Sequence, residues 1–161
     1  VLQAKGRSDA NKPLLLLIAT LDDLPNWVSR FPSSFDQLVA HFWPGPLTLV
    51  LPARAGLPDA LIGPGSGIAV RLTSHPIALA LIRACATSLT GTSANQAGAP
   101  PCRDPDSVRI TLGNDLSAIV DGGTTVGGKP STVLDLVDDC PRILRHGAIE
   151  ARALARVVRL V

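Results

Sequence analysis

The distribution of apolar and polar positions predicts strands mixed with helices. A continuous apolar run covers residues 14–19; its length favours a strand covered on both faces and is far too short to cross a bilayer. Further strands are predicted at residues 47–51, 68–72, 88–91, 118–121, 131–136 and 142–145. Since strand and helix do not alternate strictly, we expect an α/β fold of α+β type, with helices packed on a twisted mixed sheet in one domain over residues 1–161.

Helices are indicated mainly by their end signals. Pro76 at a first helical position predicts a helix that runs to about residue 86. Asp104 or Asp106 could begin a short one, and the Arg-bearing C-terminus predicts another over residues 150–160. Earlier helical segments are expected after Thr20 or Asp22, after Ser33 or Ser34, and as one turn within residues 57–62.

Composition narrows the function classes. Apolar residues make up 46% of the chain, enough for a real core, whereas aromatic residues make up 3% and Tyr is absent, which argues against an RNA-binding module built on base stacking. The net charge of +2 is mild for a general polyanion binder but leaves room for a local basic pocket. Three cysteines without a CxxC pair predict neither a zinc site nor a disulfide framework, and favour a cytoplasmic protein.

Two loops carry the strongest candidate chemistry. The first places Lys5, Arg7 and Lys12 on a short segment ahead of the first strand, and the second, residues 91–95, follows an apolar run with the sequence Gly-Thr-Ser-Ala-Asn. Lysine and arginine donate to phosphate or carboxylate, and the short polar side chains add donors at close range. If the fold brings the loops together in a concave basic cleft, they form an anion site able to hold a nucleotide.

Other motifs point less clearly to function. The segment Gly123 to Lys129 begins like a Walker A loop, but Pro130 stands where Ser or Thr would hold magnesium, so we interpret it as a Gly-rich connection. No clustered acidic or histidine residues predict a dedicated metal cage. Arg71 lies within an apolar strand, where a cation is costly unless paired, and this pattern leaves a structural ion pair and an anion clamp equally open.

Seven motifs in order resemble the threonylcarbamoyl-AMP synthase family, with its YrdC-type fold. They are Lys5-Gly6-Arg7 with Asn11-Lys12-Pro13-Leu14, Phe42 to Thr48, Ala69 to Leu72 with His75-Pro76, Thr92 to Asn95 with Gly98, Asp121-Gly122-Gly123, Pro130 to Asp135, and Ile143 to Arg145 with Gly147 to Ile149. The resemblance spans nearly the whole chain. Family members usually carry a Pro-Thr-Asp-Thr-x-Tyr-Gly-Leu segment upstream; with no Met and a start at Val1, we expect that an N-terminal piece is missing.

The resemblance assigns roles to three sets of residues. ATP binding falls on Arg7, Asn11 (with Lys12 as its alternative), Gly67, Ser93, Asn95, Pro101 and Arg145, with Gly67 and Pro101 acting through backbone. Threonine binding falls on Arg71, which would clamp the carboxylate, and on Gly91 and Ser131. Lys5 and Arg7 would be the catalytic cations beside the phosphates.

The implied reaction joins L-threonine, bicarbonate and ATP into threonylcarbamoyl-AMP and releases pyrophosphate. The adenylate would serve tRNA threonylcarbamoyladenosine modification through downstream transferase proteins, with magnesium held mainly by the phosphates. One alternative is a non-catalytic module that binds double-stranded RNA or tRNA with the same cations. Another, carbamoyl transfer within a maturation factor, is disfavoured by the absence of companion zinc-type cysteines in this sequence.

Overall fold

A computed structural model describes residues 1–6 and 13–161, so the predicted site residues Arg7, Asn11 and Lys12 lie outside the described residues. The contacts within the chain group it into two compact units. The loop unit comprises Val1–Ala10 and Thr92–Gly128, and the sheet unit comprises Asn11–Gly91 and Lys129–Val161. Each unit is described by itself, and the single domain and the concave basic cleft stay predictions.

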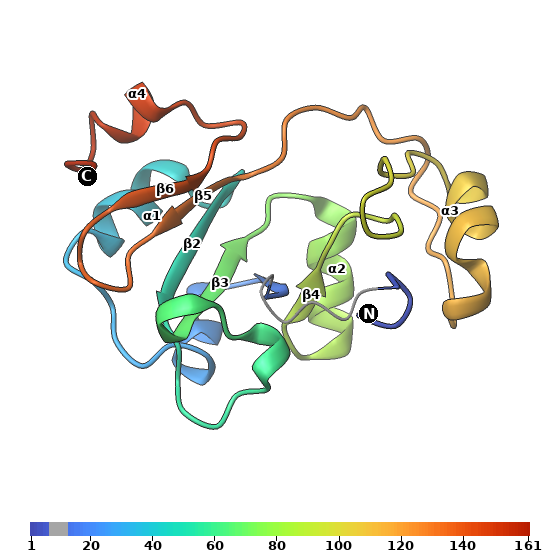
Figure 1. The fold of residues 1–161 in the computed structure, drawn as a ribbon, viewed down its shortest axis with the longest axis horizontal. Coiled ribbons are helices and arrows are strands. Elements are labelled where there is room, and N and C mark those ends of the chain that lie inside the picture. Colours follow the sequence, from blue (N-terminus) through green and yellow to red (C-terminus); the bar gives the residue numbers. More distant parts are fainter. Residues whose placement is uncertain (7–12) are drawn as a thin grey trace. The chain divides into compact units, whose positions relative to one another are not determined.

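The sheet unit is built on one mixed sheet of six strands in the order β4-β1-β3-β2-β5-β6 (Figure 1). The strands are β1 Leu15–Ile18, β2 Leu47–Pro52, β3 Gly67–Leu72, β4 Leu89–Gly91, β5 Thr132–Asp135 and β6 Arg142–Arg145. The pairs β1–β3 and β2–β5 are parallel, and the other three pairs are antiparallel. The predicted mixed sheet is therefore confirmed, and six of the seven predicted strands are found.

The core of the sheet unit follows the central strands, as the apolar runs predict. Leu47, Leu49 and Leu51 of β2 are fully buried, and so are Ile68 and Val70 of β3. In β1, Leu16 and Ile18 are buried while Leu15 and Leu17 are half-buried. One face of this strand is therefore fully covered and the other only partly, whereas the sequence predicts cover on both faces. Burial of both faces of β2 and β3 gives the site residues on these strands a rigid support.

Helices border the sheet at the positions that their end signals predict. They are α1 Phe35–Phe42, α2 Pro76–Cys85 and α4 Ala151–Leu154, with 3-10 turns η1 Leu21–Asn26, η2 Asp59–Leu61 and η3 Pro64–Ser66. His75 caps α2 ahead of Pro76, and Ala86 ends it in the left-handed conformation with φ 50°. In Figure 1, α1 and α2 lie behind the strands, and α2 contacts β1.

The loop unit has little regular structure apart from α3 Pro105–Leu112 and the 3-10 turn η4 Gly113–Asp115. Of the two caps considered, Asp104 is the one used: its carboxylate accepts from the Ser107 backbone N–H at 2.8 Å. Along the chain, α3 follows the loop that carries Ser93 and Asn95.

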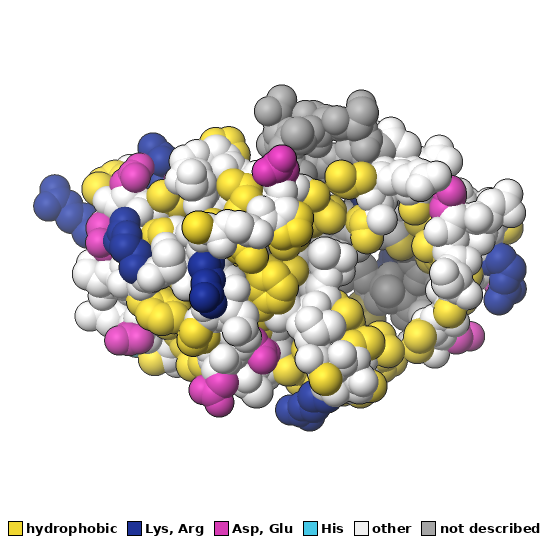
Figure 2. All heavy atoms as spheres, turned by 90° about the horizontal axis from the view of Figure 1, so that it is seen from below, with side chains coloured by type: hydrophobic (Ala, Val, Ile, Leu, Met, Phe, Trp, Pro, Cys, Tyr) yellow, Lys and Arg dark blue, Asp and Glu magenta, His cyan; other side chains and the backbone are white. Residues whose placement is uncertain are grey.

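Two predictions of secondary structure are wrong. Residues 118–121 form no strand; their short apolar run is not paired with any strand among the described residues. The C-terminal helix ends at Leu154 instead of continuing to 160, because the following chain turns so that Val158 is buried and the Val161 N–H bonds to the Pro141 carbonyl. Within the described residues, no helix has the length and apolar character needed to cross a membrane. Figure 2 shows charged and apolar side chains interspersed on one face.

Candidate functional site

Lys5 is the anchor of a polar cluster in the loop unit. Only 6% of its surface is exposed, and its ammonium donates to the carbonyls of Ser93 at 2.7 Å and Asn95 at 2.8 Å, and to Asn95 Oδ1 at 3.0 Å. Carbonyl and amide oxygens are suitable acceptors for an ammonium group, which can only donate. A charge buried this deeply needs such partners, so Lys5 ties the N-terminal segment to the loop that follows β4.

Ser93 and Asn95 are arranged by bonds within their own loop. The Ser93 hydroxyl donates to Asn95 Oδ1 at 2.5 Å, and Asn95 Nδ2 donates to the Gln96 and Ala99 carbonyls. Asn95 is buried, whereas Ser93 is exposed. The structure thus brings together the predicted residues Lys5, Ser93 and Asn95, with the exposed edge of the cluster formed by Ser93.

A second polar cluster lies in the sheet unit, where β5 begins. Ser131 is buried, and its Oγ lies 2.8 Å from Thr48 Oγ1 on β2. Arg145, at the end of β6, donates through Nη2 to Ser131 Oγ at 3.0 Å, and through Nε and Nη2 to the Ser131 carbonyl at 3.2 and 3.0 Å. The predicted threonine-binding Ser131 and ATP-binding Arg145 are therefore in direct contact.

An irregularity in the β5–β6 pairing sets the position of Arg145. Leu134 pairs with Ile143, yet the preceding Val133 pairs with Arg145, so Leu144 is an extra residue with 54% of its surface exposed. A bulge of this kind bends a strand and redirects its side chains. In an unbroken register, Arg145 would pair with Thr132, one residue earlier in β5.

Arg71 is held on the central strand β3 by one backbone contact. Its Nε donates to the Gly45 carbonyl at 2.8 Å. No acidic side chain pairs with it among residues 1–6 and 13–161, so the structural ion pair that the sequence left open is not found there. Partial burial lowers the pKa of Arg71 through desolvation, and the two terminal nitrogens of its fork have no described acceptor.

Three further predicted site residues are Gly67, Gly91 and Pro101, of which Gly67 and Pro101 were predicted to act through backbone. Gly67 is buried at the start of β3, where a side chain would collide with Val50 and Val137; Gly91 ends β4 against Leu17. Pro101 is exposed in the loop unit. The contacts of all three with ligands stay predictions.

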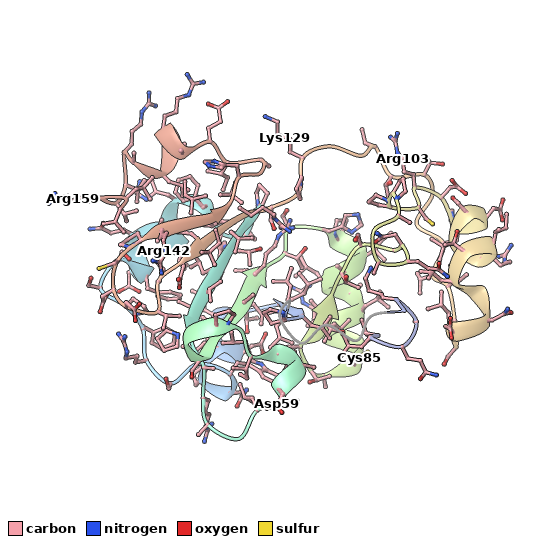
Figure 3. All side chains as sticks on the ribbon, in the orientation of Figure 1. Asp59, Cys85, Arg103, Lys129, Arg142 and Arg159 are labelled. Atoms are coloured by element: carbon pink, nitrogen blue, oxygen red, sulfur yellow. The ribbon has the colours of Figure 1, made fainter. Side chains whose placement is uncertain are left out.

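The Gly-rich segment before β5 does not lead into a helix, as a Walker A loop would. Extended chain, not a helix, follows Lys129, which supports the rejection of a Walker A motif. Arg103 holds this segment within the loop unit by donating to the carbonyls of Thr125 at 3.1 Å and Val126 at 2.8 Å. Lys129 belongs to the sheet unit and points away from it (Figure 3).

Sequence reasoning gave no site role to two residues that the structure places beside Ser131. Thr48 contacts the Ser131 hydroxyl, and Gly147 approaches the Pro130 and Ser131 backbone so closely that any side chain would collide with it. A hydroxyl at one position of the otherwise apolar strand Leu-Thr-Leu-Val-Leu was the available signal for Thr48. The close approach of Gly147 depends on tertiary contact and has no local signal.

The comparison with known families decides the relationship. The family model Sua5_yciO_yrdC, described as telomere recombination, matches residues 1–147. The chain belongs to this family. The Sua5–YciO–YrdC assignment agrees with the resemblance that the seven motifs carry.

Several curated relatives of this chain are named threonylcarbamoyl-AMP synthase. The threonylcarbamoyl-AMP synthase of Bacillus subtilis (strain 168) is 38% identical over 162 residues, which is 98% of this chain and 46% of that protein. The threonylcarbamoyl-AMP synthase of Nitrosococcus oceani is 38% identical over 135 residues, 84% of this chain and 72% of that protein. The chain spans about half the length of the first of these relatives.

Solved structures share the fold of this Sua5–YciO–YrdC chain. Pyrococcus abyssi Sua5, solved in complex with L-threonine, matches with a TM-score of 0.90 at 35% identity, over 99% of this chain and 47% of its own. E. coli YciO matches with a TM-score of 0.74 at 25% identity, over 94% of this chain and 73% of its own. The α/β class and the YrdC-like architecture are thereby confirmed.

Proposed function

We propose that this chain carries out L-threonylcarbamoyladenylate synthesis, a nucleotidyl transfer that forms threonylcarbamoyl-AMP and pyrophosphate from L-threonine, bicarbonate and ATP. The product would supply tRNA threonylcarbamoyladenosine modification through downstream transferase proteins. The names of the curated relatives support the reaction, and the Pyrococcus abyssi Sua5 structure with L-threonine supports the amino-acid substrate. A cytoplasmic location stays a prediction from the cysteine pattern.

The observation that carries the proposal is the hydrogen bonding of the Arg71 guanidinium. Among the described residues, the half-buried guanidinium of Arg71 is bonded through Nε alone, which keeps its planar pair of terminal nitrogens for another acceptor. That fork matches the two oxygens of a carboxylate, and a charge-assisted bond of this kind is about twice as strong as a neutral one. Arg71 would therefore clamp the carboxylate of L-threonine, beside Ser131 and Gly91.

The chemistry requires little proton transfer by the protein. Threonine and bicarbonate would form N-carboxythreonine, whose carboxylate attacks the α-phosphorus of ATP while pyrophosphate leaves. Catalysis then depends on positioning and on positive charge near the phosphates, the role proposed for Lys5, Arg7 and Arg145. Removing one such charge contact should cost about 2–4 kcal/mol of transition-state stabilisation.

Magnesium would be bound chiefly by the phosphates of ATP and by water. Over the described part of the chain, no group of three or more His, Cys, Asp or Glu residues lies close enough together to hold a metal ion. Magnesium keeps several waters and takes substrate phosphates as ligands in many nucleotide sites. The proposal therefore assigns no residue of this chain to the metal.

The decisive test is pyrophosphate release from ATP by the complete polypeptide as the cell makes it. Release should require both L-threonine and bicarbonate. Arg71→Lys, which keeps the charge but loses the fork, should raise the KM for threonine by at least about tenfold. Arg54→Lys is the matched control, since Arg54 is exposed and also bonds a backbone carbonyl, that of Pro25. Release that does not depend on threonine would refute the proposed function.

The RNA-binding alternative predicts a different response to salt. Affinity for a phosphate backbone should fall steeply with ionic strength, whereas binding of a small amino acid should not. Double-stranded RNA or tRNA binding is kept as an outcome of the salt test.

A further inference from the structure

Thr48 is a buried polar residue whose position demands an explanation. It lies on β2, between β3 and β5, with only 2% of its surface exposed, and its neighbours Leu47 and Leu49 are fully buried. Burying a hydroxyl without a hydrogen bond costs about 1–3 kcal/mol, so an apolar residue would stabilise this place in the strand more simply. The hydroxyl bonds Ser131 Oγ at 2.8 Å, and no other bond to it is found in the described part of the chain.

The hydrogen bonds of Ser131 limit what its hydroxyl can offer a ligand. A serine hydroxyl has one proton and two lone pairs. The guanidinium of Arg145 can only donate, so it occupies one lone pair of Ser131 Oγ. The bond with Thr48 then uses either the second lone pair or the proton.

These two arrangements give Ser131 opposite polarity. When Thr48 donates, the proton of Ser131 remains for an acceptor such as a carboxylate oxygen. When Thr48 accepts, a lone pair of Ser131 remains for a donor such as an amine. Thr48 accommodates both because its own hydroxyl can rotate between donating and accepting.

We propose that Thr48 is a positioning residue that holds the Ser131 hydroxyl against Arg145 and leaves it able either to donate to a ligand or to accept from one, and thereby tunes threonine binding. The inference rests on the proposed function for its substrate. With only 2% of its surface exposed, Thr48 would act on Ser131 from inside the sheet. The bond between Ser131 and Arg145 would also connect the predicted threonine-binding and ATP-binding residues.

The test compares steady-state kinetics of variants of the complete polypeptide. Thr48→Val keeps the side-chain shape but removes the hydroxyl; it should raise the KM for threonine about tenfold and leave kcat within about twofold. Thr48→Ser restores the hydroxyl and should restore the KM. Thr48→Ala, which also lacks the hydroxyl and adds no bulk, should repeat the effect if the valine variant does not fold.

The matched control is Thr132→Val. Thr132 is also fully buried, but its hydroxyl is bonded to the backbone of Ile149, which accepts at 2.7 Å and donates at 3.0 Å. This variant should lose stability and keep the wild-type KM for threonine. It separates a general loss of stability from a change at Ser131.

A double-mutant cycle identifies the route of the effect. In a Ser131→Ala background, Thr48→Val should change the KM for threonine by less than about twofold, because the hydroxyl that it positions is gone. An unchanged KM in Thr48→Val, or the same fold-change with and without Ser131, would overturn this inference while an active wild type leaves the proposed function standing. A wild type without threonine-dependent pyrophosphate release would overturn both.

Discussion

The loop unit and the sheet unit each hold a polar cluster, and the clusters are stabilised in different ways. In the loop unit, a buried ammonium gathers carbonyl and amide oxygens from a segment about ninety residues away in sequence. In the sheet unit, strand pairing sets the positions of the cluster: Thr48 lies within β2, Ser131 directly precedes β5 and Arg145 ends β6. One cluster depends on a single charged side chain and the other on backbone pairing.

This difference determines how each cluster should fail. Removal of Lys5 takes a charged donor away from three acceptors of this loop, so the chain around Ser93 and Asn95 should loosen as a whole. Removal of a side chain in the sheet unit leaves the strands paired, so the fault should stay local. A change to backbone geometry should instead disturb the sheet unit more than the loop unit.

The largest effect is expected from Lys5→Met. Methionine keeps most of the length of the side chain but removes the ammonium, and breaking such buried charged contacts costs about 3 kcal/mol. Hydrogen exchange should accelerate through residues 92–103, and pyrophosphate release should be lost. Lys129→Met, at an exposed position, is the control and should exchange like the wild type. Unchanged protection of residues 92–103 in the Lys5 variant would mean that the loop is held by other contacts.

Gly147→Ala tests the sheet unit through its backbone. A Cβ at this position would collide with the Pro130 carbonyl and with the Ser131 backbone, so the chain must shift exactly where Ser131 is held. Overpacking of this kind costs about 1–3 kcal/mol, and we expect the KM for threonine to rise with it. Chemical denaturation and kinetics measure the two effects.

Gly113→Ala is the counterpart of that variant in the loop unit. Gly113 has helical angles, φ −55° and ψ −35°, and a Cβ there would meet Arg109 only at an ordinary contact distance of 3.5 Å. It should fold and react like the wild type. Equal losses in the two alanine variants would show that glycine removal as such, rather than the approach to Ser131, is responsible.

The strands of the sheet unit could be predicted because their signals are local. The apolar run at residues 14–19 and the β-branched run at residues 131–136 each bury a face of the sheet, and the structure confirms both strands. Residues 118–121 carry a similar short run but find no strand partner among the described residues, and a strand depends on pairing. The C-terminal helix is shorter than the predicted range 150–160, since Val158 is buried by a turn of the chain.

The candidate site could be predicted in part because some of its residues also have a local signal in the sequence. Residue types that bind anions identified Lys5, Ser93 and Asn95 and left the role of Arg71 open, whereas Ser131 and Arg145 followed from the family resemblance. The structure gives Lys5, Ser93, Ser131 and Arg145 a polar contact with another of these residues. The burial of Lys5 and the contact between Thr48 and Ser131 join segments far apart in sequence. Such contacts depend on the fold: the hydroxyl of Thr48 in an apolar strand marks an unusual residue, but the local pattern does not name its partner.

Arg103→Met and Arg30→Met compare one kind of anchor in the two units. Arg103 donates to the Thr125 and Val126 carbonyls in the loop unit, and Arg30 donates to the Val137 carbonyl and pairs with Asp139 in the sheet unit. Both arginines are exposed, so each change should cost no more than about 1 kcal/mol of unfolding free energy. Hydrogen exchange should rise at residues 121–128 in the Arg103 variant and not in the Arg30 variant, because Arg103 bonds two carbonyls of that segment.

The smallest effect concerns two aspartates whose pKa values lie below the ordinary range. The side-chain and backbone bonds from Ser107 lower the pKa of Asp104, and the backbone and side-chain bonds from Ser33 lower the pKa of Asp139. A carboxyl group with a lowered pKa in the folded state stabilises it above the unfolded pKa, about 3.9, and loses this contribution as the pH falls through the folded value. Acid should therefore weaken α3 in the loop unit and the Ser33 turn in the sheet unit.

Asp104→Asn and Asp139→Asn separate these two contributions. The amide oxygen of asparagine can still accept a hydrogen bond, so each variant keeps a contact and loses only the titrating charge. Relative to the wild type, each should be slightly less stable at neutral pH, and the difference should shrink as the pH falls toward about 2. Denaturation curves across this range measure the effect, with local exchange at residues 105–112 reporting on Asp104. A difference that stays constant with pH would show that the carboxylate charge contributes nothing in either unit, and that geometry alone holds both turns.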